Sequence, residues 1–206
     1  MFKRVHAFVF MLVIGLAGCS NPPQQGAVLD NAAKQQLWKK RVQTLSNQQS
    51  WKLLGRASVT YRDENYPFGL DWQQQNANSH QLLIRHPVTQ SQLAKLVSNN
   101  SKVTLTTNKG AVLRDSSADR LIEQQLRVKI PVDGMQSWVR GLAAPQYPVT
   151  HIVLDNFGRP TTIEQAGWSV RYAAYKGAST AAMPSSIVIS RSQPQNVRVK
   201  VRVKSW

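Results

Sequence analysis

The sequence predicts an α+β protein built on one large antiparallel sheet. Short segments in which apolar and polar residues alternate recur from about residue 51 to residue 204, and turn-forming residues separate them. Three segments combine apolar residues at helical spacing with capping signals. The chain shows no regular strand–helix–strand alternation, which would indicate a parallel sheet. Together these observations favour successive antiparallel strands with one apolar face, accompanied by a few separate helices.

The first predicted element is an amphipathic helix over about residues 30–47. Asp30 or Asn31 can cap its start. Basic residues, Arg41 among them, surround its apolar residues. Those apolar residues recur at helical spacing and form one stripe: Leu37, Trp38, Val42 and Leu45.

Strands are predicted next, because the period of the apolar residues changes to two. Asn108-Lys109-Gly110 is a turn signal between the last two strands of this group. The predicted strands lie over about residues 53–61, 68–73, 82–85, 103–106 and 112–113.

Two further helices interrupt the strands. Ser116–Asp119 offers a capping-box-like start for the first of them. Asp133 and Gln136 have capping-box spacing and predict the start of the second, which ends near Gly141. The small residues of 176–183 predict a mobile loop. Alternation then predicts strands around residues 152–154, 163–164, 168–172, 187–189 and 197–204.

Composition narrows the classes of function. The 206 residues include 26 Lys and Arg against 10 Asp and Glu, a formal net charge of +16, which by itself suggests nucleic acid or an anionic surface as partner. An apolar fraction of 42% excludes a disordered basic tail, and a single cysteine excludes a disulfide framework. No two of the four histidines have helical metal-site spacing, so neither a metal nor a cofactor is expected.

The amino terminus changes this interpretation. Residues 1–18 combine a basic start with an apolar core, Phe8–Leu16, that is too short for a membrane span of roughly 20 residues. The following Leu16–Cys19 resembles the bacterial lipobox, which implies that Cys19 is lipidated. The prediction is therefore a signal peptide over residues 1–18, a lipidated flexible tether over 19–29 and one domain over 30–206. Nucleic acid then ceases to be an expected partner.

No motif of catalysis is present, so we do not expect an enzyme. The segment Gly177–Ala181 comes closest to a nucleophile elbow around Ser179, but it lacks the second glycine. Phosphate-binding glycine loops and paired carboxylates are also missing from the sequence. His80, His86 and His151 are interpreted as surface or turn residues.

Several segments, in the right order along nearly the whole chain, resemble the LolB family of outer-membrane lipoprotein receptors. The most specific is Leu154–Arg159 followed by Gln165–Tyr172. The other segments that carry the resemblance are Trp51–Arg56, Asp71–Gln74, Ile130–Val132, Trp138–Leu142, Met183-Pro184 and the closing basic strand that ends at Trp206.

The resemblance implies an incomplete antiparallel β-barrel of about 9–11 strands, with a lid or plug of about three α-helices over a hydrophobic cavity. It implies a monomer at the outer membrane, facing the periplasm, with Ser20 after the lipidated cysteine favouring that membrane. Such a protein receives lipoproteins from a soluble, LolA-like periplasmic carrier, holds their acyl chains, and delivers them into the outer-membrane phospholipid without a cofactor.

The candidate residues for an acyl-chain cavity are apolar residues of the predicted strands and helices. Periodicity alone does not distinguish a filled core from a hollow one. The candidates are Ala57, Val59, Phe68, Leu70, Trp72, Leu82, Ile84, Val103, Leu105, Leu121, Trp138, Ile152, Leu154, Ile163, Val170 and Tyr172.

Pro87 and Val88 are candidates for a membrane-delivery loop. His86–Thr89 resembles a protruding loop that carries an exposed leucine in familiar members of the family. Here Val88 takes that position, and Thr89 follows instead of the usual glycine. Valine buries about one methylene less, or ~0.8 kcal/mol. The alternative is an ordinary hairpin tip.

The last strand alternates valine with basic residues. Its basic side chains, Arg198, Lys200, Arg202 and Lys204, should face solvent, either as a simple solvated face or as contacts for the carrier or for anionic headgroups. The second of these leads to an alternative function, in which an envelope scaffolding lipoprotein binds a partner or anionic lipid through this face.

Overall fold

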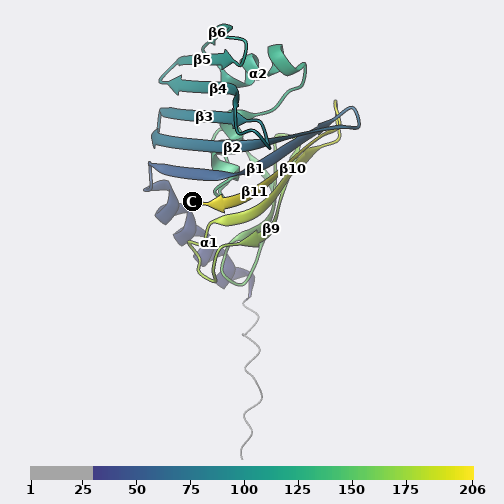
Figure 1. The fold of residues 1–206 in the computed structure, drawn as a ribbon. Coiled ribbons are helices and arrows are strands. Elements are labelled where there is room, and N and C mark those ends of the chain that lie inside the picture. Colours follow the sequence, from purple (N-terminus) through teal and green to yellow (C-terminus); the bar gives the residue numbers. More distant parts are fainter. Residues whose placement is uncertain (1–29) are drawn as a thin grey trace, which may run out of the picture.

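One antiparallel sheet of eleven strands dominates the computed structural model, which describes residues 30–206 (Figure 1). The predicted signal peptide (1–18), the tether (19–29) and Cys19 lie outside the described residues. None of the helices within residues 30–206 combines the length and the apolarity that a bilayer span requires.

Each strand pairs with its neighbours in sequence, except that β1 also pairs with β11 and that β6 and β7 do not pair. The strand order is β6-β5-β4-β3-β2-β1-β11-β10-β9-β8-β7, so β1 pairs with the last strand and the edges are β6 and β7. The sheet is therefore open, and the predicted α+β class with an incomplete antiparallel barrel is confirmed. The strands are β1 (Trp51–Tyr61), β2 (Glu64–Asn76), β3 (Ser79–Arg85), β4 (Gln92–Asn99), β5 (Lys102–Thr107), β6 (Val112–Asp115), β7 (Val149–Leu154), β8 (Pro160–Gln165), β9 (Trp168–Tyr175), β10 (Pro184–Arg191) and β11 (Val197–Ser205).

Strand β4 was not predicted. Leu93, Leu96 and Val97 stand at i, i+3 and i+4, a spacing that is typical of a helix. In the structure the segment pairs with β3 and β5, with Leu96 opposite Leu82 and Leu105. Pairing on both sides of the strand thus overrides the local pattern.

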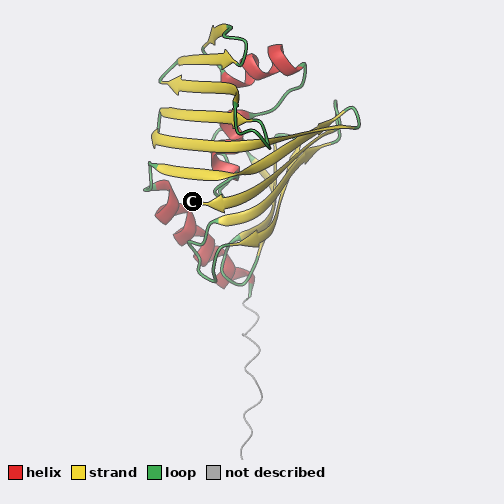
Figure 2. Ribbon diagram, viewed as in Figure 1, coloured by secondary structure: helices red, strands yellow, loops and turns green. Residues whose placement is uncertain are grey.

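Three helices accompany the sheet: α1 (Asn31–Ser46), α2 (Ala118–Leu126) and α3 (Val132–Trp138) (Figure 2). Asp30 Oδ1 accepts a hydrogen bond of 2.7 Å from the Ala33 amide, and Ser117 Oγ accepts one of 3.3 Å from the Arg120 amide, so both predicted caps form.

The predicted capping role of Asp133 is wrong. Helix α3 begins at Val132, and Pro131, two residues before Asp133, occupies the cap position without a side-chain hydrogen bond. The Asp133 amide instead donates to Asp119 Oδ1 at 3.2 Å, which joins the first turns of α2 and α3.

One half of the sheet is filled by large side chains. Trp138 of α3 is fully buried against Trp168, with ring centroids 6.4 Å apart. Its Nε1 donates to Gln165 Oε1 at 2.8 Å, and the Tyr172 hydroxyl donates to the Trp138 carbonyl at 2.9 Å. The buried indole of Trp138 and the buried phenol of Tyr172 are thus both hydrogen-bonded, which avoids the cost of an unpaired polar group. These large side chains occupy the space between Trp138 and strands β8 and β9.

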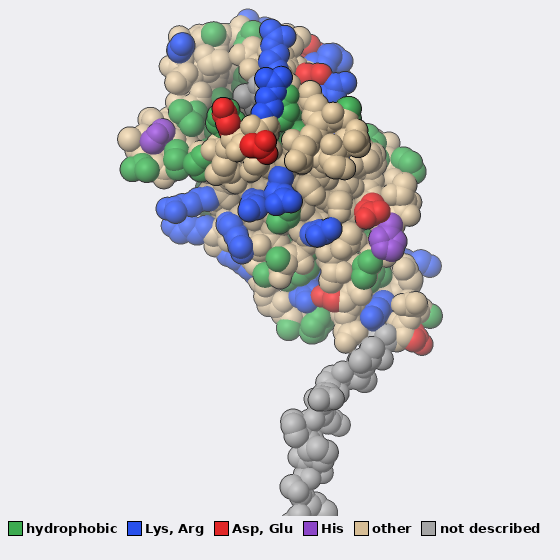
Figure 3. All heavy atoms as spheres, turned by 90° about the vertical axis from the view of Figure 1, so that its right-hand side faces the viewer, with side chains coloured by type: hydrophobic (Ala, Val, Ile, Leu, Met, Phe, Trp, Pro, Cys, Tyr) green, Lys and Arg blue, Asp and Glu red, His purple; other side chains and the backbone are tan. Residues whose placement is uncertain are grey.

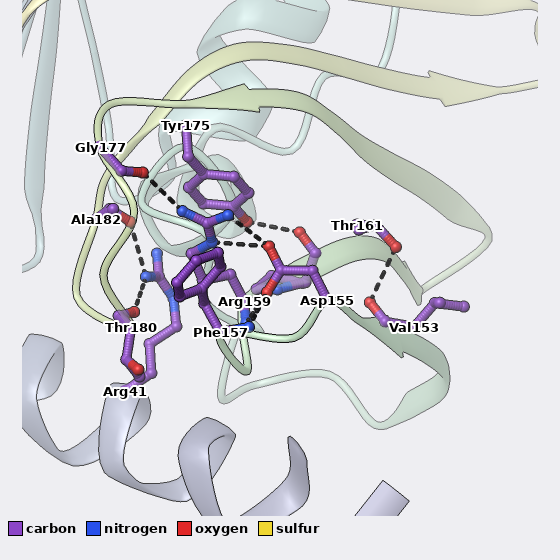
Figure 4. Close-up of polar contacts among 11 residues, drawn as sticks. Arg41, Val153, Asp155, Phe157, Arg159, Thr161, Tyr175, Gly177, Thr180 and Ala182 are labelled. Atoms are coloured by element: carbon purple, nitrogen blue, oxygen red, sulfur yellow. Dashed lines mark hydrogen bonds and ion pairs between the residues drawn. The ribbon is translucent and has the colours of Figure 1, made fainter. Parts of the chain in front are cut away.

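Arg41 of α1 is buried, contrary to the expectation that it belongs to the polar surroundings of the apolar stripe. Its guanidinium donates to the carbonyls of Thr180 and Ala182, in the loop between β9 and β10 (Figure 4). The neighbouring Arg159 donates to Asp155 and to the carbonyl of Gly177 in the same loop. Two arginines therefore hold a segment that composition alone predicted to be mobile.

Candidate functional site

The other half of the molecule encloses an apolar cavity of about 580 Å³ between the sheet and helices α2 and α3. This volume lies within the range of roughly 300–1,000 Å³ that is typical of small-molecule sites. Strands β1 to β5 and β11 supply one wall. Helix α2, the linker after it and helix α3 supply the other wall, so the two helices cover the concave face of the sheet.

Eight of the predicted cavity residues line this space, and all lie on β1, β2, β3 or β5. They are Ala57, Val59, Phe68, Leu70, Trp72, Leu82, Ile84 and Leu105.

The other eight predicted residues lie elsewhere. Val103 of β5 and Leu121 of α2 are buried but do not line the cavity. The remainder belong to the filled half or to its edge strand β7, and they are Trp138, Ile152, Leu154, Ile163, Val170 and Tyr172.

The lid side of the cavity was largely missed by sequence reasoning. Val128 and Ile130 line the cavity from the segment that links α2 to α3, and Ile122 of α2 with Val132 and Met135 of α3 adds to them. The alternation of apolar residues at 128, 130 and 132 is the signal that could have identified this wall. On the sheet side, Val199 and Val201 of β11 also line the cavity.

Polar residues gather at one end of the cavity, where it opens. Asn65 and the half-exposed Tyr66 follow the β1–β2 turn, Asn108 follows β5, and Gln125 lies near the end of α2. All four side chains are exposed to solvent. This arrangement leaves an apolar interior behind a polar rim, so an apolar chain can enter while its polar end stays in water.

The opposite, deep end of the cavity is bounded by Trp72, and beyond it lie His80 and Gln74. Burial lowers the pKa of His80 to about 4, so its imidazole is neutral at physiological pH. Gln136 of α3 lies 3.2 Å from His80 Nδ1. The deep wall therefore carries no charge that would repel an apolar ligand. Residues 30–206 contain no group of three or more His, Cys, Asp or Glu side chains placed to hold a metal ion.

The β3–β4 loop projects from the sheet and exposes Val88, whose side chain is 81% accessible. The loop is held by its own hydrogen bonds. His86 Nδ1 accepts from the amides of Val88 and Thr89 at 3.3 and 3.2 Å, and the Gln90 side-chain amide donates to the Pro87 carbonyl at 3.1 Å. An exposed valine at the tip of an internally bonded loop is available to contact an apolar surface.

The last strand divides its residues between two faces as predicted. The valines of β11 are buried, and Arg198, Lys200, Arg202 and Lys204 are exposed. Figure 3 shows Lys and Arg side chains gathering on the left flank of the molecule, below a lobe that projects to the left. Few acidic side chains interrupt them.

Comparison with known families gives a match over most of the chain. The sequence model of the family described as "Outer membrane lipoprotein LolB" matches residues 49–206. A relative named outer-membrane lipoprotein LolB from Nitrosococcus oceani is 31% identical over 200 residues, which cover 97% of this chain and 96% of the relative. A relative with the same name from Cellvibrio japonicus is 26% identical over 210 residues, which cover 100% of this chain and 98% of the relative.

The fold also has a counterpart among solved structures. The crystal structure of a LolA superfamily protein from Nitrosomonas europaea aligns with a TM-score of 0.51, covering 84% of this chain and 91% of that protein. The two sequences are 8% identical over the alignment, so this likeness concerns the fold alone.

Proposed function

The chain belongs to the LolB family of outer-membrane lipoproteins, and on that premise we propose that it receives lipoproteins from a soluble periplasmic carrier, holds their acyl chains in the cavity, and delivers them into the outer membrane. A role in lipoprotein localisation follows from the family. The steps of acceptance, holding and delivery are the proposal. Cys19 would carry the lipid that anchors the chain, after removal of residues 1–18.

The open, apolar cavity is the observation that carries the proposal. Its wall is formed mainly by aliphatic and aromatic side chains, with Thr107 as a polar exception, and its exposed polar residues lie at the rim. Each methylene that moves from water into such a site gains about 0.8 kcal/mol. An acyl chain thus binds without a specific hydrogen bond, which suits a receptor that must accept lipoproteins of different sequence.

Delivery requires that the cavity does not bind acyl chains too tightly. The proposal includes no ATP, metal or catalytic step, so each transfer follows the difference in free energy between carrier, receptor and bilayer. The cavity is open at its rim, and its contents can therefore leave without unfolding of the sheet. Val88 would bring that rim to the membrane by inserting into the apolar part of the bilayer.

Site-specific photocrosslinking tests acceptance. A photoreactive residue replaces Ile84 or Leu105 in the cavity, and each variant is mixed with a carrier that is loaded with a lipoprotein. We expect covalent capture of the lipoprotein at both positions. Val149, an exposed apolar residue of edge strand β7, serves as the matched control and should capture nothing.

An alternative function, that of an envelope scaffold, is favoured by the exposed cations of β11. It predicts that neutralising Arg198, Lys200, Arg202 and Lys204 abolishes function, whereas filling the cavity has no effect. Absence of capture at every cavity position, in protein that is folded and mixed with a loaded carrier, would contradict our proposal and favour this alternative.

A further inference from the structure

A second hollow of about 610 Å³ lies on the outer face of the sheet, the face turned away from α2 and α3. Outward-facing residues of β1, β2 and β11, together with Arg85 of β3 and Gln90 of the projecting loop, form its walls. We call it the arginine groove. It is lined by Leu54, Gly55, Arg56, Gly69, Leu70, Asp71, Arg85, Gln90, Arg202, Val203 and Lys204.

A row of cross-strand neighbours forms the centre of the arginine groove. Arg202 of β11 lies opposite Arg56 of β1, which lies opposite Gly69 of β2, which lies opposite Arg85 of β3. Directly paired side chains of neighbouring strands are about 5 Å apart at Cβ, and like charges in that position destabilise a sheet. Gly69 carries no side chain, and the Arg85 Cβ and the Gln90 side-chain oxygen lie 3.3 and 3.5 Å from the position that its Cβ would take.

The positive charge of the arginine groove is not neutralised by the protein. Asp71 is the one acidic residue in its lining, and its carboxylate faces Lys52 at 3.9 Å. Among residues 30–206, no carboxylate forms an ion pair with Arg56, Arg85, Arg202 or Lys204. Four cations against one acid, with two arginines directly opposed, indicate a site for an anion from outside the chain.

The arginine groove adjoins the projecting loop. Arg85 Nη1 donates to the Gln90 carbonyl at 3.2 Å, and Gln90 itself lines the groove. Val88, with its 81% exposed side chain, is two residues from Gln90. The cationic groove therefore adjoins the apolar tip of the β3–β4 hairpin, the combination needed to bind the charged surface and the apolar interior of a bilayer together.

We propose that the arginine groove binds the anionic headgroup of a membrane phospholipid, with its phosphate between Arg56, Arg85 and Arg202. Guanidinium groups suit this role because they bind phosphate oxygens through two parallel hydrogen bonds. The site would set the orientation of the chain on the membrane and hold Val88 against the bilayer. It deepens the delivery step and so rests on the proposed function.

The test uses the full lipid-anchored chain in vesicles of phosphatidylethanolamine with increasing phosphatidylglycerol. A polarity-sensitive dye on Thr89→Cys reports whether the tip enters the bilayer, since Cys19 is the only other cysteine and its thiol carries the lipid. We expect the emission to shift to the blue as phosphatidylglycerol increases. Each cation near an anionic bilayer contributes about fivefold in affinity, so Arg56→Gln with Arg202→Gln should weaken the response about 25-fold.

The matched control removes two charges outside the arginine groove, by Arg171→Gln with Lys102→Gln, both exposed strand positions. It should respond to phosphatidylglycerol like the parent, and inorganic phosphate should not shift the emission of the dye.

Equal losses of membrane response in both double variants would overturn the proposal and indicate a general attraction between the basic chain and the anionic membrane. An unchanged dye response in the groove variant, with impaired acceptance from the carrier, would overturn it in favour of an acidic protein surface. Acceptance of lipoproteins in solution, measured separately, tests the proposed function independently.

Discussion

Arg41 Nε of α1 donates a hydrogen bond of 3.0 Å to the carbonyl oxygen of Gly141, which lies 100 residues further along the chain. The same guanidinium bonds the carbonyls of Arg140 and Ala182 at 2.6 and 2.8 Å. Helix α1 is thereby joined to the turn after α3 and to the loop before β10. Since α3 is part of the cavity lid, this buried arginine links the first helix to the element that covers the binding site.

Replacing Arg41 with methionine should destabilise the fold by about 3 kcal/mol. Methionine fills part of the volume, but the buried carbonyls lose their donors, and each unsatisfied group costs about 1–3 kcal/mol. Urea unfolding measures the loss. Lys40→Met, at an exposed position of the same helix, should stay within about 0.5 kcal/mol of the parent. Equal stability of the two variants would mean that Arg41 does not hold α1 in place.

Gly158→Ala should destabilise the fold by about 3 kcal/mol or more. Gly158 has a φ of +67°, and a Cβ there would overlap Leu37 and lie 2.8 Å from the Trp38 amide nitrogen of α1. Both the left-handed backbone and the close approach thus exclude a side chain. Gly167→Ala isolates the first effect, because Gly167 has a φ of +74° and open space around it.

The comparison of these two variants by thermal unfolding is the informative measurement. Gly167→Ala should cost about 1 kcal/mol, the penalty of a left-handed non-glycine residue. A Gly158→Ala variant no less stable than Gly167→Ala would show that α1 does not pack against the β7–β8 turn as described.

The pKa of Asp119 is raised to about 6 by burial and by the neighbouring Asp133, whose own pKa burial also raises. Because the folded state binds the proton more tightly than the unfolded chain does, stability falls as pH rises from about 4 to about 6. Asp119→Asn should therefore raise the free energy of unfolding at pH 7 by roughly 1 kcal/mol after allowance for partial exposure. A higher melting temperature at pH 7 would show this gain. At pH about 3.5 the variant and the parent should melt alike. A constant difference at both pH values would contradict this explanation.

Val88 should set the rate at which bound lipoprotein enters a membrane. Val88→Leu adds about one methylene of buried area, ~0.8 kcal/mol, and should speed transfer from loaded receptor to vesicles by about fourfold. Val88→Glu should slow it severely and leave loading from the carrier intact. Val149→Glu, at an exposed apolar position on the opposite part of the sheet, is the control. If both glutamate variants slow transfer equally, the loop has no special role.

Local patterns predicted most of the elements but not their surroundings. The alternation of valine and basic residues in β11 identified both faces of that strand, and Ser117 marked the start of α2. Leu93, Leu96 and Val97 have helical spacing, and only pairing with strands on either side places them in β4. Likewise Arg41 resembles any helical surface cation until distant carbonyls surround it.

The periodicity of apolar residues does not predict which half of the sheet is hollow. Leu70 and Val170 occur in the same alternating pattern, yet Leu70 lines the cavity and Val170 is packed in the filled half. The difference comes from the lid: α3 places Trp138 over β8 and β9, whereas the smaller Ile130 and Val132 cover β1 to β3. A sequence pattern within a strand carries no information about which side chains lie across from it.

Binding of an acylated lipoprotein to a receptor with a filled cavity tests the central claim most directly. Ala57→Phe places a ring in the cavity, and Ser58→Phe places the same ring on the opposite face of β1, because successive residues of a strand alternate sides. With both variants folded by circular dichroism, the transfer of lipoprotein from carrier to receptor is measured. We predict that Ala57→Phe loses at least tenfold in acceptance while Ser58→Phe matches the parent. Equal acceptance by all three proteins would contradict the assignment of the cavity as the acyl-chain site.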